Sequence, residues 1–150
     1  MKCKRFVVMI LTILISCSTY NIYANENTDD EIEEKIDASQ NIIEEFGDGQ
    51  EDLELFSNMV RVNWTVKNGV RMKTKQFYKK KGSSINIDFK ISPETKSIKV
   101  GYLDEDQVKH YKTVKAKIKH DFTIQKTGYI KVFVENNSGK TVKVMGDYTK

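Results

Sequence analysis

Few side chains of this sequence combine the residue type and the spacing that a metal site needs. His110 and His120 are the only histidines, and they lie ten positions apart with no third ligand at a matched spacing. Because His120 shares strand parity with Phe122 and Ile124, we expect it to begin a buried row rather than to bind zinc. Asp104-Glu105-Asp106 lacks the twelve-residue loop, the glycine and the terminal glutamate of an EF-hand, so we expect a solvated turn there. The sequence predicts no metal and no cofactor.

Catalytic nucleophiles are equally scarce. The two cysteines, Cys3 and Cys17, both fall within residues 1–24. That segment starts with basic residues and continues with an apolar run at 6–15, which is too short to span a bilayer and is typical of a signal peptide. No nucleophile–base motif and no glycine-rich phosphate loop follows. We therefore expect a protein that is not an enzyme; a small hydrolase whose carboxylates pair only in space is an alternative.

Two processing sites follow the apolar run. Leu14-Ile15-Ser16-Cys17 resembles the lipobox of bacterial lipoproteins, which implies that Cys17 is lipidated and becomes the new N-terminus. Ile22-Tyr23-Ala24 would instead suit ordinary signal peptidase, with Ala24 as the last residue removed. We favour the first site, and so expect an extracytoplasmic protein held at the membrane by a lipid anchor rather than freely secreted. In both cases the mature chain has at most one cysteine, which excludes an intramolecular disulfide.

Residues 25–57 form an acidic segment, with thirteen Asp and Glu residues against Lys35 alone. Thr28 and Glu31 have the spacing of a capping box, and Gly47 would end a helix that begins there. Four apolar residues recur behind this cap at helical spacing: Ile32, Ile36, Ile43 and Phe46. The segment predicts one amphipathic N-terminal α-helix followed by a linker. A flexible acidic spacer is the alternative.

From residue 58 to residue 150 the pattern changes to apolar residues at every second position. Val60, Val62, Trp64 and Val66 alternate with polar residues, and Asn68-Gly69 then marks a tight turn. Seven further segments have strand character: 70–77, 85–91, 98–102, 108–114, 122–124, 129–134 and 142–144. The fold class that we expect is mainly β, an antiparallel eight-stranded β-sandwich of the jelly-roll kind preceded by the helix, with Trp64 in its core.

The last two segments predict a hairpin and an apolar patch beside it. If Val134 faces Val142, then Val132 faces Val144, and Asn137-Ser138-Gly139 is the loop. Apolar side chains then lie on the opposite face of the sheet as well, and such a patch should be covered. We predict that the acidic helix covers it. The predicted docking patch comprises Ile32, Ile36, Ile43, Phe46, Tyr129, Phe133 and Met145.

Charge divides the chain at about residue 57. Residues 58–150 hold 21 Lys and Arg against 8 Asp and Glu, a net charge of +13, whereas residues 25–57 carry thirteen acidic groups less one lysine, or −12. The predicted basic surface comprises Lys79, Lys80, Lys81, Lys112, Lys115, Lys117 and Lys119. Its partner would be an anionic cell-wall polymer, a lipid headgroup or a protein ligand, but not nucleic acid. The alternative is that these lysines keep turns solvated and sheet edges unpaired.

The stretch 97–148 carries a family resemblance. Its strand and turn residues, Ile98-Lys99-Val100-Gly101-Tyr102, Thr127-Gly128-Tyr129 and Val134-Glu135-Asn136-Asn137-Ser138, resemble small exported β-sandwich proteins of Gram-positive bacteria, including pre-peptidase C-terminal and jelly-roll modules. The resemblance implies a fold and a binding or supporting role, and it assigns no functional residue. We expect a non-enzymatic binding or interaction module at the bacterial cell envelope. An immunity-type or wall-polymer-binding lipoprotein that uses the basic surface is the nearest alternative.

Overall fold

The computed structural model describes residues 30–47, 50–51 and 58–150. The predictions for residues 1–24, including Cys17, and for the cap at Thr28 lie outside this part of the chain. Within it the chain forms strands and no α-helix, and hence no helix long and apolar enough to cross a membrane. The strands are β1 (Ile32–Lys35), β2 (Ile43–Phe46), β3 (Gln50–Glu51), β4 (Met59–Val66), β5 (Val70–Lys73), β6 (Phe77–Lys79), β7 (Ser84–Ser92), β8 (Ile98–Leu103), β9 (Val108–Val114), β10 (Lys117–Thr123), β11 (Gly128–Asn136) and β12 (Val142–Thr149).

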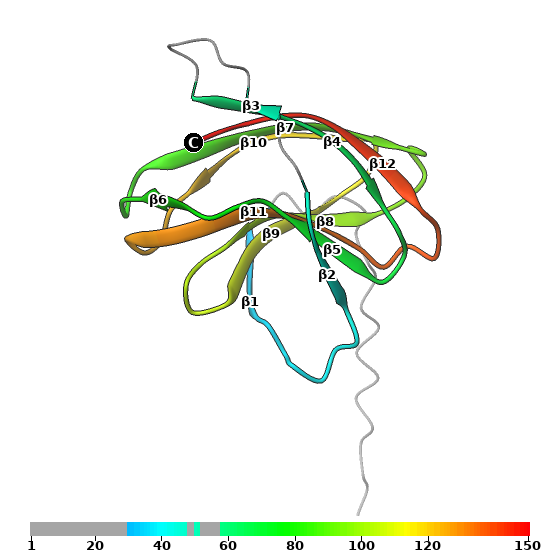
Figure 1. The fold of residues 1–150 in the computed structure, drawn as a ribbon, viewed down its shortest axis with the longest axis horizontal. Helices are drawn as coiled ribbons and strands as arrows, with labels where there is room; N and C mark the ends of the chain where they lie inside the picture. Colours follow the sequence, from blue (N-terminus) through cyan, green and yellow to red (C-terminus); the bar gives the residue numbers. More distant parts are fainter. Residues whose placement is uncertain (1–29, 48–49, 52–57) are drawn as a thin grey trace, which may run out of the picture.

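The strands form two sheets that are stacked on each other. One is seven-stranded, with the order β1-β9-β8-β11-β5-β2 and with β6 also paired to β11; the other is five-stranded, with the order β10-β7-β12-β4-β3. Figure 1 shows the five-stranded sheet above the seven-stranded one, with β1 and β2 below. Nearly every pairing is antiparallel, the exception being β2 with β5. The predicted mainly-β, two-sheet architecture is confirmed.

The predicted count of eight strands is too low for the described residues, which form twelve. Each predicted segment contains a strand, but the second one, 70–77, is broken into β5 and β6. The break falls at Thr74, whose backbone N–H donates to Val132 O and whose Oγ1 accepts the N–H of Val132. A side-chain hydroxyl here replaces a ladder hydrogen bond. The other three additional strands come from the acidic segment.

Strict alternation places one face of each long strand in a shared core between the sheets. The inward-facing residues of β4 are Val60, Val62, Trp64 and Val66. Trp64 is buried as predicted, and its ring meets that of Phe89 on β7 edge to face, with 6.3 Å between the centroids. Period-two patterning identified these residues correctly because a half-buried strand presents alternate side chains to opposite faces.

The acidic segment is not helical where the structure describes it. Ile32–Lys35 pairs antiparallel with β9 at one edge of the seven-stranded sheet, and Ile43–Phe46 pairs parallel with β5 at the other. We call residues 30–47 the N-terminal strap, because the chain between its two strands crosses from one edge of the sheet to the other (Figure 1). The helix prediction is wrong here, since Ile32 and Ile36 also fit period two, with Glu34 between them half-buried on the same side.

The predicted hairpin of the last two segments is also wrong. β11 pairs with β8, β5 and β6 in one sheet, whereas β12 pairs with β4 and β7 in the other. Val142 lies opposite Val66 and Val144 opposite Trp64. The valines of β11 and β12 do meet in the common core, but from opposite sheets, so alternation alone gave the correct inward faces and the wrong partner strand.

Candidate functional site

The outer face of the seven-stranded sheet contains a buried ion pair. Arg71 on β5 lies opposite Glu135 on β11, and it donates from Nε at 2.8 Å and from Nη2 at 2.5 Å to Glu135 Oε2. The two side chains are 2% and 1% exposed. A buried charge is tolerated only when it is paired and hydrogen-bonded, and the fork of an arginine meets that condition better than a lysine would.

Glu44 of the strap extends this ion pair on the β2 side. Its Oε1 lies 3.1 Å from Arg71 Nη1, and its Oε2 accepts a hydrogen bond from Lys73 on β5. Although burial raises the pKa of Glu44, the hydrogen bonds and charges of Lys73 and Arg71 lower it below its usual value of 4.5. Glu44 therefore stays ionised and binds β2 to β5 through side chains as well as backbone.

Glu34 of the strap does the same on the β1 side. Its Oε2 accepts hydrogen bonds from Tyr111 Oη at 2.9 Å and from Lys99 Nζ at 3.1 Å. Lys109, which is fully buried, places Nζ 3.2 Å from the same oxygen and 3.6 Å from Glu135 Oε2, but makes no well-directed hydrogen bond. Burial raises the pKa of Glu34, yet these donors outweigh it and hold the pKa at about 2.

These contacts form one ionic network across the outer face, from β1 to β2. Its four cations are Arg71, Lys73, Lys99 and Lys109, and its three carboxylates are Glu34, Glu44 and Glu135. Four cations less three anions leave +1 with the strap in place. Two of the carboxylates belong to the strap, so without it the described residues of this network would comprise four cations and one anion, or +3. The strap therefore neutralises most of the charge of the network.

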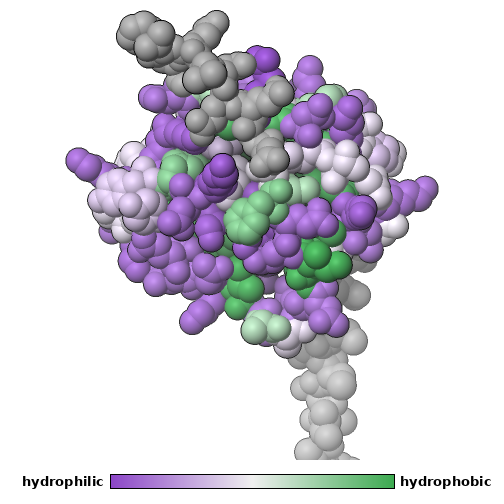
Figure 2. Space-filling model, viewed as in Figure 1, coloured by the Kyte–Doolittle hydropathy of each residue, from purple (hydrophilic) through white to green (hydrophobic). Residues whose placement is uncertain are grey.

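An apolar cluster lies beside the network under the same strap. Leu103, Tyr111 and Phe133 are buried on the outer face, and Ile32 and Ile36 of the strap pack against them. Three members of the predicted docking patch thus come together, under strands rather than under a helix. The other four are exposed: Ile43, Phe46, Tyr129 and Met145. Figure 2 shows apolar side chains around β1 and β2 in the lower part of the view, within a mostly hydrophilic surface.

The lysines of the predicted basic surface do not form one surface. Lys79 ends β6, and Lys80 and Lys81 follow it in the β6–β7 turn. These three lysines lie beside the end of β10, where Lys81 N donates to Thr127 Oγ1. Lys117 begins β10 at its other end, about 20 Å away for a strand of this length. Lys112 is on β9, in the other sheet. Lys119 faces Asp88 across the β10–β7 ladder, with 3.6 Å between Nζ and Oδ2.

One lysine of that prediction instead lies at a shallow pocket on the outer face of the five-stranded sheet. Lys117 is directly opposite Lys90 of β7, and the exposed Met145 of β12 is opposite Lys90 on its other side. The pocket has a volume of about 330 Å³, and Ser92, Glu94 and Ala116 complete its wall. Among the described residues neither lysine has a carboxylate within ion-pair distance. Like charges directly opposite each other on a sheet repel, which makes this pair unusual.

Sequence reasoning missed Lys90, because its importance depends on which strand pairs with which. Lys90 and Lys117 are 27 positions apart, and only the β10–β7 register places them side by side. Lys143 also approaches this end of the sheet, opposite Ser92. A cross-strand lysine pair leaves no local signal in a single sequence. We call Lys90, Lys117 and the pocket between them the lysine pocket.

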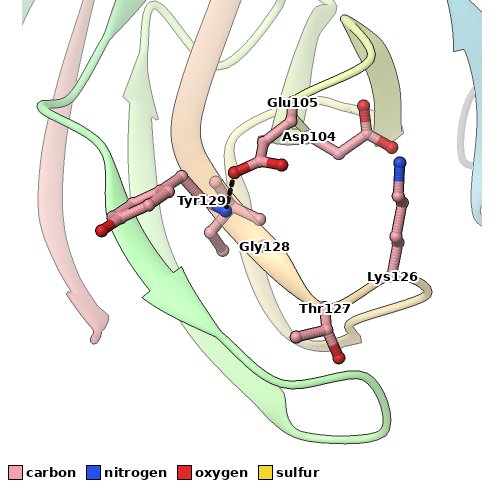
Figure 3. A pocket seen from close by; sticks show the side chains of 7 residues that line it. Asp104, Glu105, Lys126, Thr127, Gly128 and Tyr129 are labelled. Carbon is pink, nitrogen blue, oxygen red and sulfur yellow. Dashed lines mark hydrogen bonds between the residues drawn. The ribbon is translucent and has the colours of Figure 1, made fainter.

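The acidic turn between β8 and β9 is held by the protein's own donors. Asp104 Oδ1 accepts the backbone N–H groups of Asp106 and Val108, both at 2.9 Å. Glu105 Oε1 accepts the N–H of Tyr129 at 2.8 Å (Figure 3). Asp106 pairs with Lys126 at 2.5 Å. These carboxylates are therefore occupied by structural contacts of the turn.

Both histidines are engaged in contacts with neighbouring side chains. His110 stacks on Tyr102 with 4.5 Å between the ring centroids, and its Nε2 lies 3.4 Å from Asp104 Oδ2. His120 Nε2 lies 2.8 Å from Glu31 Oε1 at the start of the strap, and its ring meets Phe122 edge to face. No group of three His, Cys, Asp or Glu side chains that could hold a metal ion occurs among the residues that the structure describes.

The geometry thus offers one closed face and one open pocket. The closed face holds the strap, and the pocket is bordered by two exposed lysines that have no ion-pair partner among the described residues. No protein-family model and no curated protein matches this chain.

Proposed function

We propose that this protein is a non-enzymatic binding module at the bacterial cell envelope, and that its lysine pocket binds an anionic group of a wall polymer. The observation that carries the proposal is the directly opposed pair Lys90 and Lys117, which borders a pocket of about 330 Å³. Among the described residues no carboxylate lies within ion-pair distance of either lysine, and Glu94 is the acidic side chain in the pocket wall. An anion between the two ammonium groups would remove their mutual repulsion. Charged groups on a solvated face of this kind give salt-sensitive binding.

The location that we propose is outside the cytoplasm, with the body tethered through lipid on Cys17. The support is the sequence pattern of residues 1–24, in which Cys17 lies two positions after the apolar run at 6–15. Intact mass and detergent partitioning of the native protein test it. A diacylglyceryl group on Cys17 is the expected result, and a chain that begins at Asn25 would show release instead.

The binding proposal is tested by charge reversal at the lysine pocket. We expect the double variant Lys90→Glu and Lys117→Glu to bind synthetic poly(glycerol phosphate) at least about tenfold more weakly than the unaltered protein. The affinity of the unaltered protein should fall as NaCl is raised from about 50 to about 500 mM, because salt screens exposed charges. Isothermal titration calorimetry at both salt concentrations measures these effects.

The matched control is Lys67→Glu with Lys75→Glu, which changes the net charge equally at two exposed lysines elsewhere. Equal loss of affinity in both double variants would show attraction by net charge and contradict a defined pocket. A third variant that reverses Lys79, Lys80 and Lys81 tests the β6–β7 turn as the site. Vesicles that contain phosphatidylglycerol are tested in parallel. If the protein binds these vesicles but not the polymer, then the ligand is the membrane surface and the wall-polymer proposal is wrong.

A further inference from the structure

A third exposed lysine continues from the lysine pocket across the outer face of the five-stranded sheet. Lys143 on β12 is opposite Ser92, a residue of the pocket wall that lies two positions beyond Lys90 on β7. Like Lys90 and Lys117, Lys143 is exposed and has no ion-pair partner among the described residues. The three lysines therefore lie on three adjacent strands, β10, β7 and β12. We call Lys117, Lys90 and Lys143 the lysine row.

The strand register gives the spacing of the lysine row. Lys117 and Lys90 are directly opposite each other, so their Cα atoms are about 5 Å apart. Lys143 lies one strand over from Lys90 and two residues along, which corresponds to about 8 Å between Cα atoms. All three side chains occupy outward-facing positions in the alternation of their strands. The lysine row therefore crosses the strands over a length of about 13 Å.

The charges next to the lysine row favour an anion that lies across the strands rather than along them. The neighbouring row toward the start of β7 comprises Lys119, Asp88, Asp147 and Arg61. Its charges sum to zero, and the two aspartates are directly opposite each other at its centre, so it offers an extended anion no net attraction. The lysine row carries three positive charges, which Glu94 of the pocket wall reduces to +2.

The side chains of the lysine row suit a flexible chain with one negative charge per repeat. A lysine ammonium group is a compact point charge on a flexible stem, so each can meet one anionic group. Met145 and Ser92 occupy the other two corners of the square that Lys90 and Lys143 define, and they offer an apolar surface and a hydroxyl to an uncharged spacer. Once one anionic group is bound, the linked groups bind intramolecularly, which raises the affinity of the whole chain.

We propose that an extended polyanion with one charge per repeat crosses the strands from β10 to β12, with Lys143 as its third contact. The inference rests on the proposed function, because the polyanion begins at the lysine pocket. It adds the direction of the bound chain, a length of three anionic groups, and one residue that the pocket does not contain.

The test is an NMR titration of the full chain with synthetic glycerol phosphate oligomers that contain one, two, three or six phosphodiester groups. The affinity should rise at least about tenfold from one group to three, because three linked groups reach all three lysines, and less than about threefold from three to six. Lys143→Gln should weaken binding of the three-group oligomer about fivefold. It should change binding of the one-group compound less than about twofold, since a single anion needs only the pocket.

The matched control is Lys119→Gln. Lys119 is also exposed and also lies about 8 Å diagonally from Lys90, but in the neighbouring row. This variant changes the net charge equally and should leave binding of the three-group oligomer within about twofold. Equal losses in Lys119→Gln and Lys143→Gln would overturn the proposed path across the strands. An affinity that does not rise from one phosphodiester group to three would overturn it as well.

Failure of the proposed function has a different signature. If the double variant Lys90→Glu and Lys117→Glu binds the polymer as the unaltered protein does, then the lysine pocket is not the site, and the path that starts there is wrong too. If the double variant loses binding but Lys143→Gln does not, then the pocket binds a single anionic group and only the path to β12 is wrong.

Discussion

The outer faces of the two sheets treat their lysines in opposite ways. On the seven-stranded sheet, Lys109 is fully buried and shares the carboxylates of Glu34 and Glu135. On the five-stranded sheet, Lys90 and Lys117 stand opposite each other at an open pocket, with no carboxylate in ion-pair distance among the described residues. Lys109 therefore takes part in a buried ionic network, whereas Lys90 and Lys117 are exposed and have no ion-pair partner among the described residues. Among the described residues, the strap adds Glu34 and Glu44 to the seven-stranded face, whereas on the five-stranded face Asp88 pairs with Lys119 and leaves Lys90 and Lys117 without an ion-pair partner.

This asymmetry shows why the net charge of the sequence is a poor guide to its partners. The strap's glutamates are already used by the cations beneath them, so an anionic ligand that approached the strapped face would have to displace Glu34 and Glu44. Among the described residues, nothing has to be displaced at the lysine pocket on the five-stranded sheet. An anionic ligand would therefore meet the lower energetic cost on the five-stranded sheet.

The largest effect that can test this contrast is loss of the buried carboxylate of the strapped face. Glu135→Gln leaves Arg71 and Lys109 buried with one fewer counter-charge, which should lower the free energy of unfolding by about 3–5 kcal/mol. Urea denaturation followed by tryptophan fluorescence measures it, since Trp64 is the only tryptophan. The control is Asp147→Asn on the outer face of β12, opposite Asp88, where we expect a change within about 0.5 kcal/mol.

A double variant distinguishes an unpaired charge from lost packing. Arg71→Met with Glu135→Leu removes both ions and keeps most of the volume, so it should be less destabilised than Glu135→Gln alone. If it is destabilised more, the arginine–glutamate pair itself stabilises the face, and the attraction between the two ions exceeds the cost of burying them.

Apolar contacts between the strap and the sheet should give a smaller effect. Ile36→Ala removes a half-buried side chain that packs against Leu103, Tyr111 and Phe133, and should cost about 1–2 kcal/mol. Ile43→Ala is the matched control, because Ile43 also lies in the strap but is 63% exposed. Thermal and urea unfolding of the two variants make the comparison, and equal losses would contradict the contact assigned to Ile36.

These contacts also show how far the sequence could lead. Period-two alternation identified the inward faces of the long strands, because that signal is local to each strand. It also placed Phe133 on an outer apolar face that needs cover. It could not choose between helix and strand for Ile32 and Ile36, since a spacing of four satisfies both periods, and the choice is made by free backbone groups at two distant sheet edges.

The sequence could not predict which distant strands pair, because the alternation signal is local to each strand. Val134 and Val142 are close in sequence and both face the core, so a hairpin satisfied every local rule, but the strands belong to different sheets. The lysine pocket likewise depends on the β10–β7 register. The ion pair between Arg71 and Glu135 depends on the β11–β5 register. Local patterns fix which face a residue occupies, whereas its neighbour across the ladder is a property of the whole topology.

Acid should weaken the strapped face by protonating Glu34. Its pKa in the folded protein is about 2, below the ordinary value of 4.5, so its contribution is complete above pH 4.5 and is lost as the pH falls toward 2. We expect the free energy of unfolding to decline by about 1–2 kcal/mol over this interval through Glu34, after allowance for partial solvent screening. Glu34→Gln should flatten that part of the profile, measured by urea denaturation at several pH values.

Glu33→Gln is the control for the pH profile. Glu33 is the neighbouring carboxylate on β1, it is exposed, and it points to the opposite side of the strand. Its replacement should leave the acid limb of the profile unchanged. Flattening of equal size in both variants would assign the acid sensitivity to the general charge of the strap rather than to the ionic network.

The smallest expected effect is a change in stability at the lysine pocket, and its sign tests whether the two lysines repel each other. Lys117→Glu places a carboxylate opposite Lys90 and converts a repulsive cross-strand pair into an attractive one, so it should raise the free energy of unfolding by about 0.2–1 kcal/mol. The same substitution on the strapped face, Lys109→Glu, should destabilise instead, since Lys109 already lies between two carboxylates. If Lys117→Glu stabilises the fold and weakens binding of poly(glycerol phosphate), then the lysine pair opposes stability and serves binding. If it destabilises the fold, the two lysines do not repel each other measurably, and an anion between them would have no repulsion to relieve.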